Sequence, residues 1–83
     1  MVMDDIINGF QEVFSEVFGI DGTTINRETS AKDVEGWDSV AHVLLIVALE
    51  KKFLIRFKSR EITGFNSVGD MLDVAERKID EKK

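Results

Sequence analysis

Cysteine is missing from this sequence, and histidine occurs only once, as His42. Without cysteine the chain can form no disulfide and has no thiol of its own for nucleophilic or redox chemistry. A single histidine cannot build a zinc site, and no carboxylates have the spacing of a calcium-binding loop. No nucleophile and base stand in a pattern typical of catalysis, so we do not expect an enzyme.

Acidic residues outnumber basic ones, and long hydrophobic runs are also missing. The formal net charge of −5 argues against nucleic-acid binding. The longest apolar run, Val43 to Leu49, is far too short to cross a bilayer, and Asp4 and Asp5 stand where a signal peptide would be basic. We therefore expect a cytoplasmic protein. We also expect it to be a monomer. Its 83 residues suffice for one modest core, which predicts a single domain over residues 1–83.

The first segment of the chain has the pattern of an amphipathic helix. Polar side chains lie opposite an apolar stripe, and Gly19 follows as a C-terminal stop. We expect a polar substitution at Phe14, within the stripe, to disrupt the core. The stripe consists of Ile6, Phe10, Val13, Phe14, Val17 and Phe18.

The last segment, near residues 67–78, shows the same pattern. Ser67 and Asp70 are spaced as a capping box, in which each side chain satisfies a backbone N–H group at the start of the helix. This pattern predicts a helix that packs on the core by one face. The apolar stripe consists of Val68, Met71, Leu72, Ala75 and Ile79.

Residues 20–37 have no sustained periodicity, which predicts a long loop between the first two helices. We expect apolar residues scattered through this loop to pin it onto the bundle. We also expect Trp37 to pack at the core or its edge rather than to contact a ligand. The scattered residues are Ile20, Ile25, Val34 and Trp37.

A central helix is predicted over roughly residues 39–53. Val40, Val43, Leu44 and Val47 form one face, but further apolar residues cover most of the circumference. Such a helix is normally buried from several sides, which is hard to arrange in so small a domain. Two interpretations therefore stay open: ordinary central packing, or an apolar flank reserved for a cargo or a partner. We expect a polar substitution at Val47 to disrupt the core.

After this helix, apolar residues alternate at Phe53, Ile55 and Phe57. With no second strand available for pairing, we expect a helix end and an extended connector rather than a sheet. Ile62 and Phe65 suggest one short helical turn before the last helix. The predicted fold is therefore all-α, a four-helix bundle with a long first loop and a short third helix.

Asp38 and Ser39 stand where the central helix begins. Asp is a preferred N-cap because its carboxylate accepts hydrogen bonds from free N–H groups of the first turn. The positive end of the helix dipole also favours an anion held there, so a serine on that turn can carry a covalently attached phosphate. The dipeptide by itself is more often only a cap, and both interpretations stay open.

The pattern as a whole resembles the acyl carrier protein family. The resemblance rests on Asp38-Ser39-Val40 opening an apolar helix that closes with Ala48-Leu49-Glu50-Lys51-Lys52-Phe53. It extends over nearly the whole chain through the order of the four helices. The family's motif reads Asp-Ser-Leu, so Val40 is a mild departure.

The resemblance implies a definite chemistry. In this family the serine that matches Ser39 receives 4′-phosphopantetheine from coenzyme A, transferred by a magnesium-dependent phosphopantetheinyl transferase. The thiol of the arm then carries an acyl group as a thioester, which suits a chain that has no cysteine. The aspartate that matches Asp38 would help to present the serine to the transferase. Acyl-loading and acyl-processing enzymes act on the cargo, and the carrier itself does not catalyse.

The other serines provide an internal comparison. Ser67 also begins a helix, but capping explains it sufficiently, and Ser15, Ser30 and Ser59 are expected to have structural roles. His42 lies one turn beyond the proposed attachment residue and could touch the arm. A packing or solvent-facing role is the more common one for such a histidine.

Departures from the family's pattern bear on the partners. Carriers of fatty-acid synthesis place acidic residues along the second helix, whereas Ala41 and Leu44 stand at two of those positions. Residues 39–60 contain one acidic residue against five basic ones. We therefore hypothesise a dedicated carrier for a specialised lipid or polyketide-type pathway, whose partners present apolar or partly acidic surfaces. An aminoacyl or peptidyl carrier and an unmodified helical interaction module are the alternatives.

Overall fold

The helices follow one another in the predicted order. The computed structural model describes residues 3–81, which form α1 (Met3–Phe18), the short 3₁₀ turn η1 (Gly22–Thr24), α2 (Ser39–Phe53), α3 (Ser59–Thr63) and α4 (Val68–Glu81). No strand occurs among these residues. The predicted all-α bundle with a long first loop and a short third helix is confirmed.

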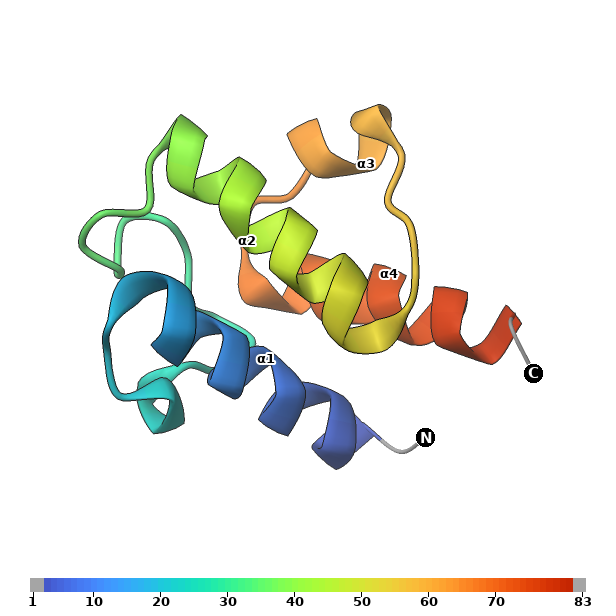
Figure 1. Cartoon of the computed structure of the whole chain (residues 1–83), viewed down its shortest axis with the longest axis horizontal. Coiled ribbons are helices and arrows are strands. Elements are labelled where there is room, and N and C mark those ends of the chain that lie inside the picture. The colour runs from blue at the N-terminus through green and yellow to red at the C-terminus, as the bar shows by residue number, and fades with distance from the viewer. Residues whose placement is uncertain (1–2, 82–83) are drawn as a thin grey trace.

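Figure 1 shows how the helices are arranged. α1 and α2 run in opposite directions, and α1 packs against both α2 and α4. α4 lies behind α2 in this view, and α3 lies on the side of α2 away from α1. The long loop closes the end of the bundle where α2 begins.

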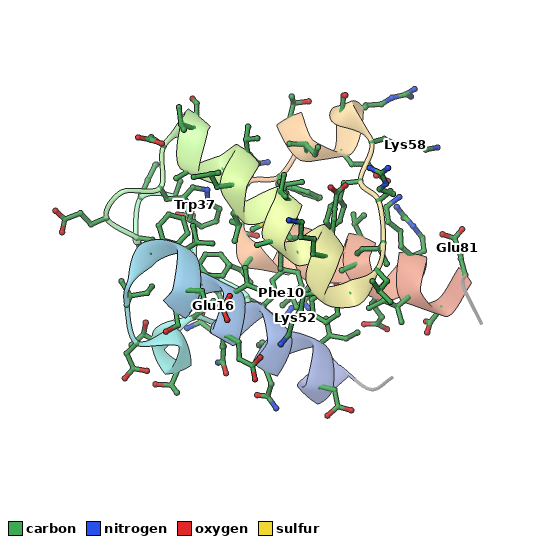
Figure 2. The ribbon with its side chains drawn as sticks, in the orientation of Figure 1. Phe10, Glu16, Trp37, Lys52, Lys58 and Glu81 are labelled. Carbon is green, nitrogen blue, oxygen red and sulfur yellow. The ribbon has the colours of Figure 1, made fainter. Side chains whose placement is uncertain are left out.

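One core of buried side chains joins α1, α2 and α4, as the two predicted stripes require. Phe10 lies between the helices, while Glu16 on the same helix points outward (Figure 2). Val17 and Phe18 at the end of α1 are partly buried against the core. The fully or nearly fully buried stripe residues are Ile6, Phe10, Val13 and Phe14 of α1 and Val68, Met71, Leu72, Ala75 and Ile79 of α4.

The turn after α1 brings the chain back onto that helix. Gly19 ends α1 with a φ of +66°, and its N–H donates to the Ser15 carbonyl at 2.9 Å, which confirms the predicted stop. Gly22 then approaches so closely that a Cβ there would lie 2.1 Å from the backbone oxygen of Gln11. The Gln11 side chain also donates to the Ile25 carbonyl at 3.0 Å. Only glycine allows η1 to lie this close to α1.

The loop over residues 20–37 is pinned to the bundle as predicted. Ile25 and Val34 are buried, and Ile20 and Trp37 are partly buried against the core. Because these side chains leave water, the loop takes one defined path in spite of its length.

The same loop also caps α4. The N–H of Val68 donates to the Thr29 carbonyl at 2.8 Å, and the N–H of Gly69 donates to the Arg27 carbonyl at 2.9 Å. The first N–H groups of a helix have no intrahelical partner, so these two bonds satisfy donors that would otherwise be buried and unpaired.

The capping box predicted for α4 forms differently from the expectation. The Ser67 hydroxyl accepts from the Asp70 N–H at 3.4 Å, which is the expected first half. The Asp70 carboxylate, however, accepts from the N–H of Asn66 at 3.0 Å rather than from that of Ser67. The helix begins at Val68, and the Ser67 hydroxyl is its side-chain cap.

α2 buries one of its sides only, through Leu45, Ile46 and Leu49. Val47 is 42% exposed, so the prediction that it lies in the core is wrong. The helix is apolar on nearly every side, and the spacing of its residues therefore does not determine which side the bundle covers. The large hydrophobic residues of α2 that are exposed are Val40, Val43, Leu44 and Val47.

The segment after α2 is an extended connector, as predicted. Leu54 ends the helix in the left-handed conformation with a φ of +56°, and Ile55 and Phe57 are buried. The Glu50 carboxylate accepts from the N–H of Phe57 at 2.8 Å. This bond holds the connector along the end of α2 and sets the position from which α3 starts.

α3 is fastened to α4 through Glu61. The Glu61 carboxylate accepts from the N–H of Lys58 at 2.8 Å, and it pairs with Lys78 at 3.0 Å and Arg77 at 3.6 Å. The hydrogen bond from Lys58, together with the two cations, lowers the pKa of Glu61 below its ordinary value of 4.5, against the opposing effect of partial burial.

The two apolar positions singled out in the sequence should respond differently to truncation. Phe14→Ala should lower the free energy of unfolding by about 3–5 kcal/mol because it leaves a cavity in a fully buried site. Val47→Ala should lower it by less than about 1 kcal/mol because solvent already reaches that side chain. Equilibrium urea denaturation measures both, and equal losses would contradict the assignment of the buried side of α2.

Glu61 should make the stability of the fold sensitive to acid. Because the folded state lowers the pKa of Glu61, the stabilisation is fully present above about pH 4.5 and is lost as the pH falls through the lower pKa of the folded state. Glu61→Gln should therefore reduce the free energy of unfolding by about 1–2 kcal/mol at pH 7, and by progressively less as the pH falls below about 4.5. Urea denaturation at several pH values tests this, with Glu35→Gln in the loop as the control. A constant difference at all pH values would be evidence against the role of the carboxylate.

Candidate functional site

The start of α2 is fixed by Asp38. This residue is extended, and its side-chain Oδ1 accepts from the N–H of Ala41 at 2.8 Å. Its backbone carbonyl accepts from the N–H of His42 at 2.8 Å, which closes the first turn of the helix. The predicted N-cap is therefore confirmed, and α2 begins at Ser39.

Ser39 is exposed on the first turn of α2. Within the part of the chain that the structure describes, its hydroxyl makes no recorded hydrogen bond. Ser67, by contrast, is partly buried and accepts from Asp70, and the Ser30 hydroxyl donates to Asp33 at 3.3 Å. Of these three serines, only Ser39 combines an exposed hydroxyl with the start of a long helix.

His42 lies one turn into α2 and uses both nitrogens of its ring. The indole N–H of Trp37 donates to Nδ1 of His42 at 3.0 Å. Because indole nitrogen only donates, Nδ1 is the acceptor and Nε2 carries the hydrogen, which it donates to the Ile62 carbonyl at 3.2 Å. His42 therefore packs at this end of α2 and links it to α3, a contact that the sequence did not indicate.

Trp37 ties this end of α2 to α1. Its ring centroid lies 5.3 Å from that of Phe14 in an edge-to-face arrangement and 6.0 Å from that of Phe18. Figure 2 shows Trp37 where the loop meets α2. Aromatic pairs in such arrangements stabilise the fold beyond the area that they bury. The predicted packing role of Trp37 is thus confirmed.

A groove runs beside Ser39, between the first half of α2 and the segment around α3. Its apolar lining comes from three parts of the chain that are far apart in sequence. Asp38, Thr63 and Asn66 add polar groups at its edge. The side chains that supply most of its apolar lining are those of Trp37, His42, Val43, Ile62 and Phe65.

An exposed apolar surface continues from the groove along α2. It consists of Val40, Val43, Leu44 and Val47, and Leu54 at the end of the helix is also 74% exposed. Contiguous apolar residues on the surface of a small domain commonly mark an interaction site. We call these five residues the α2 stripe. Their exposure favours the second interpretation of the central helix, an apolar flank that the bundle leaves uncovered.

Basic residues lie around the end of the α2 stripe. Lys52 pairs with Glu12 of α1. Among the residues that the structure describes, Lys51, Arg56 and Lys58 belong to no ion pair, and Lys58 projects away from the bundle (Figure 2). This end of the stripe is therefore electropositive although the chain as a whole is acidic.

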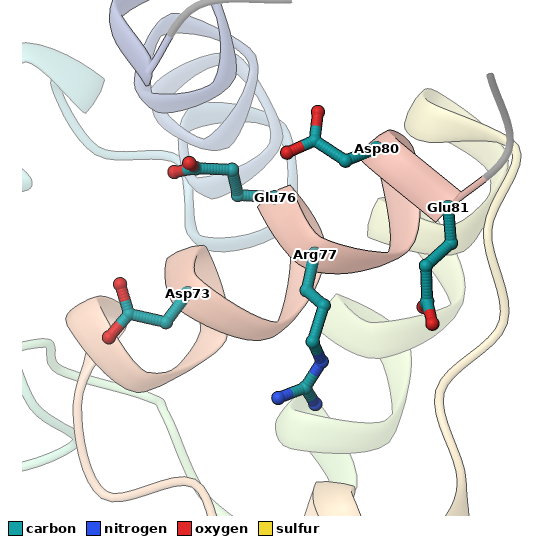
Figure 3. Close-up of a pocket in the computed structure, with 5 residues that line it drawn as sticks. All are labelled: Asp73, Glu76, Arg77, Asp80 and Glu81. Carbon is teal, nitrogen blue, oxygen red and sulfur yellow. The ribbon is translucent and has the colours of Figure 1, made fainter.

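A second depression lies on the outer face of α4 (Figure 3). Its lining consists of Arg77 and four acidic residues, and the Arg77 side chain points away from Glu76 and Asp80. The acidic residues are Asp73, Glu76, Asp80 and Glu81. Arg77 pairs with Glu61 of α3, and no cluster of metal-binding side chains is present within residues 3–81. This face has the character of a solvated helix surface rather than of a site.

Comparisons with known proteins agree with the geometry. The model of a family described as "phosphopantetheine attachment site" matches residues 8–75. The chain is 34% identical over 70 residues to an acyl carrier protein of Acidothermus cellulolyticus, covering 84% of this chain and 83% of that protein. It is 38% identical over 63 residues to an acyl carrier protein of Clostridium acetobutylicum, covering 76% and 82%. This chain belongs to the acyl carrier protein family.

Further likenesses place the fold within the same family. The solution structure of the holo acyl carrier protein of Geobacter metallireducens superimposes with a TM-score of 0.84 at 37% identity, covering 92% of this chain and 87% of that one. A protein of Mycobacterium leprae named meromycolate extension acyl carrier protein is 31% identical over 72 residues, covering 87% of this chain and 63% of that protein.

Membership decides between the functions left open by the sequence. The protein is a carrier of acyl groups and not an enzyme, and its prosthetic group is a covalently attached phosphopantetheine. A phosphopantetheinyl transferase and acyl-processing enzymes are the partners that this family implies. An exposed hydroxyl beside an apolar groove fits such a group. Within residues 3–81, no helix has both the length and the apolar character needed to cross a membrane.

Proposed function

We propose that Ser39 is the residue to which phosphopantetheine is attached. Three observations support the assignment: Ser39 is exposed, it stands on the first turn of α2, and the groove opens beside it. Helix geometry leaves the first N–H groups of α2 without intrahelical carbonyls, and the helix dipole favours a phosphate at this end. On attachment, the Ser39 oxygen loses its proton and bonds to the phosphorus of the phosphopantetheine moiety of coenzyme A. The P–O bond that joins this phosphate to the rest of the diphosphate breaks, and adenosine 3′,5′-bisphosphate leaves.

Asp38 has two roles in this proposal. It caps α2 and so keeps Ser39 on the first turn, and its exposed carboxylate helps to present the serine to the transferase and its metal. Only one oxygen of the carboxylate is used by the cap, in the bond to Ala41. We further propose that residues 1–83 form one carrier domain that works as a monomer in the cytoplasm.

Loading of the purified protein tests the assignment of Ser39. Coenzyme A, magnesium and a broad-specificity phosphopantetheinyl transferase should add one phosphopantetheine to the wild-type protein, as measured by intact mass. Ser39→Ala should abolish the adduct while changing the free energy of unfolding by less than about 0.5 kcal/mol, because the hydroxyl is exposed. Ser67→Ala is the matched control and should load normally.

Two results would count against the proposal. An adduct that persists in Ser39→Ala would place the attachment elsewhere, and the fragment mass of the modified peptide would show where. Failure of the wild-type chain to load would remove Ser39 from consideration as the site for this transferase.

Asp38→Asn separates the two roles of Asp38, because asparagine caps helices nearly as well as aspartate but has no charge to offer the transferase.

The α2 stripe supports a carrier that is dedicated to a specialised lipid or polyketide-type pathway. Ala41 and Leu44 stand on α2 where carriers of fatty-acid synthesis have acids, and Leu44 is exposed. A carrier named for meromycolate extension is among the relatives, which is consistent with service to one pathway. We propose that the partner enzymes present an apolar surface bordered by acidic residues.

The charge pattern of α2 should slow the reaction of the acyl-loaded protein with enzymes of general fatty-acid synthesis. With a housekeeping ketosynthase, we expect the acyl-loaded protein to show a kcat/KM at least about tenfold lower than that of the organism's general carrier, because complementary charge steers encounter and rejects wrong partners. Leu44→Glu should raise this value, whereas Asn8→Glu, which adds the same charge on the exposed side of α1, should not. Turnover by the wild-type protein as fast as that of the general carrier would defeat the specialised role.

A further inference from the structure

His42 lines the groove beside Ser39, and both nitrogens of its ring are engaged in hydrogen bonds. His42 accepts from Trp37 of the loop at 3.0 Å and donates to the Ile62 carbonyl of α3 at 3.2 Å. Its ring lies within 20° of the plane of the Trp37 indole. One side chain thus connects the loop, α2 and α3 at the point where the groove begins.

α3 has few attachments of its own. It is five residues long and contains no buried residue. Ile62 and the following Phe65 are partly buried, and the ring of Phe65 contacts that of Phe57 at 5.5 Å. Within residues 3–81, the recorded polar links from α3 to other helices are those of Glu61 to α4 and that of Ile62 to His42. Loss of the second link would leave α3 with no direct polar contact to α2, while its ion pairs to α4 would remain.

An acyl chain carried on an arm at Ser39 will seek apolar surface. The groove beside Ser39 offers such a surface on a wall formed by Val43 of α2 and by Ile62 and Phe65 of the α3 segment. While α3 is held against α2, this wall offers a surface groove rather than a passage between the two helices. The space available to a cargo therefore depends on the contact that holds α3 against α2.

We propose that His42 is a latch that holds α3 against α2 and so limits how deeply the acyl cargo can enter the protein. With the latch closed, the cargo lies along the groove at the surface, where a partner enzyme can reach it. Opening the latch would let the cargo pass between α2 and α3. The proposal rests on the attachment of the arm at Ser39, and His42 acts as a positioning residue that determines the size of the cargo.

The first test uses the unmodified protein and does not depend on loading. In His42→Ala, hydrogen exchange at the amides of Ile62 and Gly64 should be about threefold to tenfold faster, the range that corresponds to one hydrogen bond. His42→Gln should stay close to wild type, because its amide can still donate to the Ile62 carbonyl. Ile79→Val in α4 is the control for a general loss of stability, and it should not speed up exchange in α3 more than in the other helices.

This exchange experiment can overturn the latch. If exchange in α3 is unchanged in His42→Ala, or rises equally in Ile79→Val, His42 does not hold α3. If hydrogen exchange in α3 is as fast in His42→Gln as in His42→Ala, the ring contributes packing only. The hydrogen bond to the Ile62 carbonyl then does not hold α3 against α2.

The second test uses the octanoyl form, made with octanoyl-coenzyme A and the transferase. The thioester of His42→Ala should be cleaved by hydroxylamine at least about threefold more slowly than that of wild type or His42→Gln, because the cargo draws the thioester into the opened groove. Equal cleavage rates would show that His42 does not limit the depth of the cargo. Failure of every variant to load would instead contradict the role of Ser39, and the exchange experiment would still decide the latch.

Discussion

The residue at which α2 begins determines the geometry of the whole site. Trp37 packs inward against Phe14 and Phe18, Asp38 caps the helix, and Ser39 is the first residue beyond the cap. Successive residues of an α-helix are rotated by about 100°, so a shift of the start by one position would turn Ser39 towards a different surface. The packed, partly buried indole and the cap oppose that shift, and the exposed hydroxyl follows from them.

α2 is apolar on more sides than the bundle can cover, and this excess links the fold to the function. Leu45, Ile46 and Leu49 complete the core, while the α2 stripe stays at the surface next to Ser39. The same helix therefore holds the domain together, presents Ser39, the proposed attachment residue, and leaves an apolar surface exposed. α3 joins this arrangement through the polar contact of Ile62 with His42 and the ion pairs of Glu61 with Lys78 and Arg77 of α4.

The sequence was informative wherever a single local rule applied. The stripes of α1 and α4 have a clear helical period, Gly19 is a typical stop, and Asp38 is a preferred cap, and all of these predictions are confirmed. Val47 was assigned to the wrong side of α2 because an almost uniformly apolar helix has no period that points to the core. The second half of the capping box at Ser67 also differed, because a neighbouring N–H competes for the Asp70 carboxylate.

The sequence by itself determined the class of fold, the cap at Asp38 and the candidate serine, since each depends on residues within about one or two helical turns of one another. Only the tertiary structure decided which face of α2 stays exposed, that His42 bridges Trp37 and Ile62, and that a groove opens beside Ser39. These features join residues from three separate segments. Such contacts depend on how the helices pack in space, which the spacing of residues along one helix does not specify.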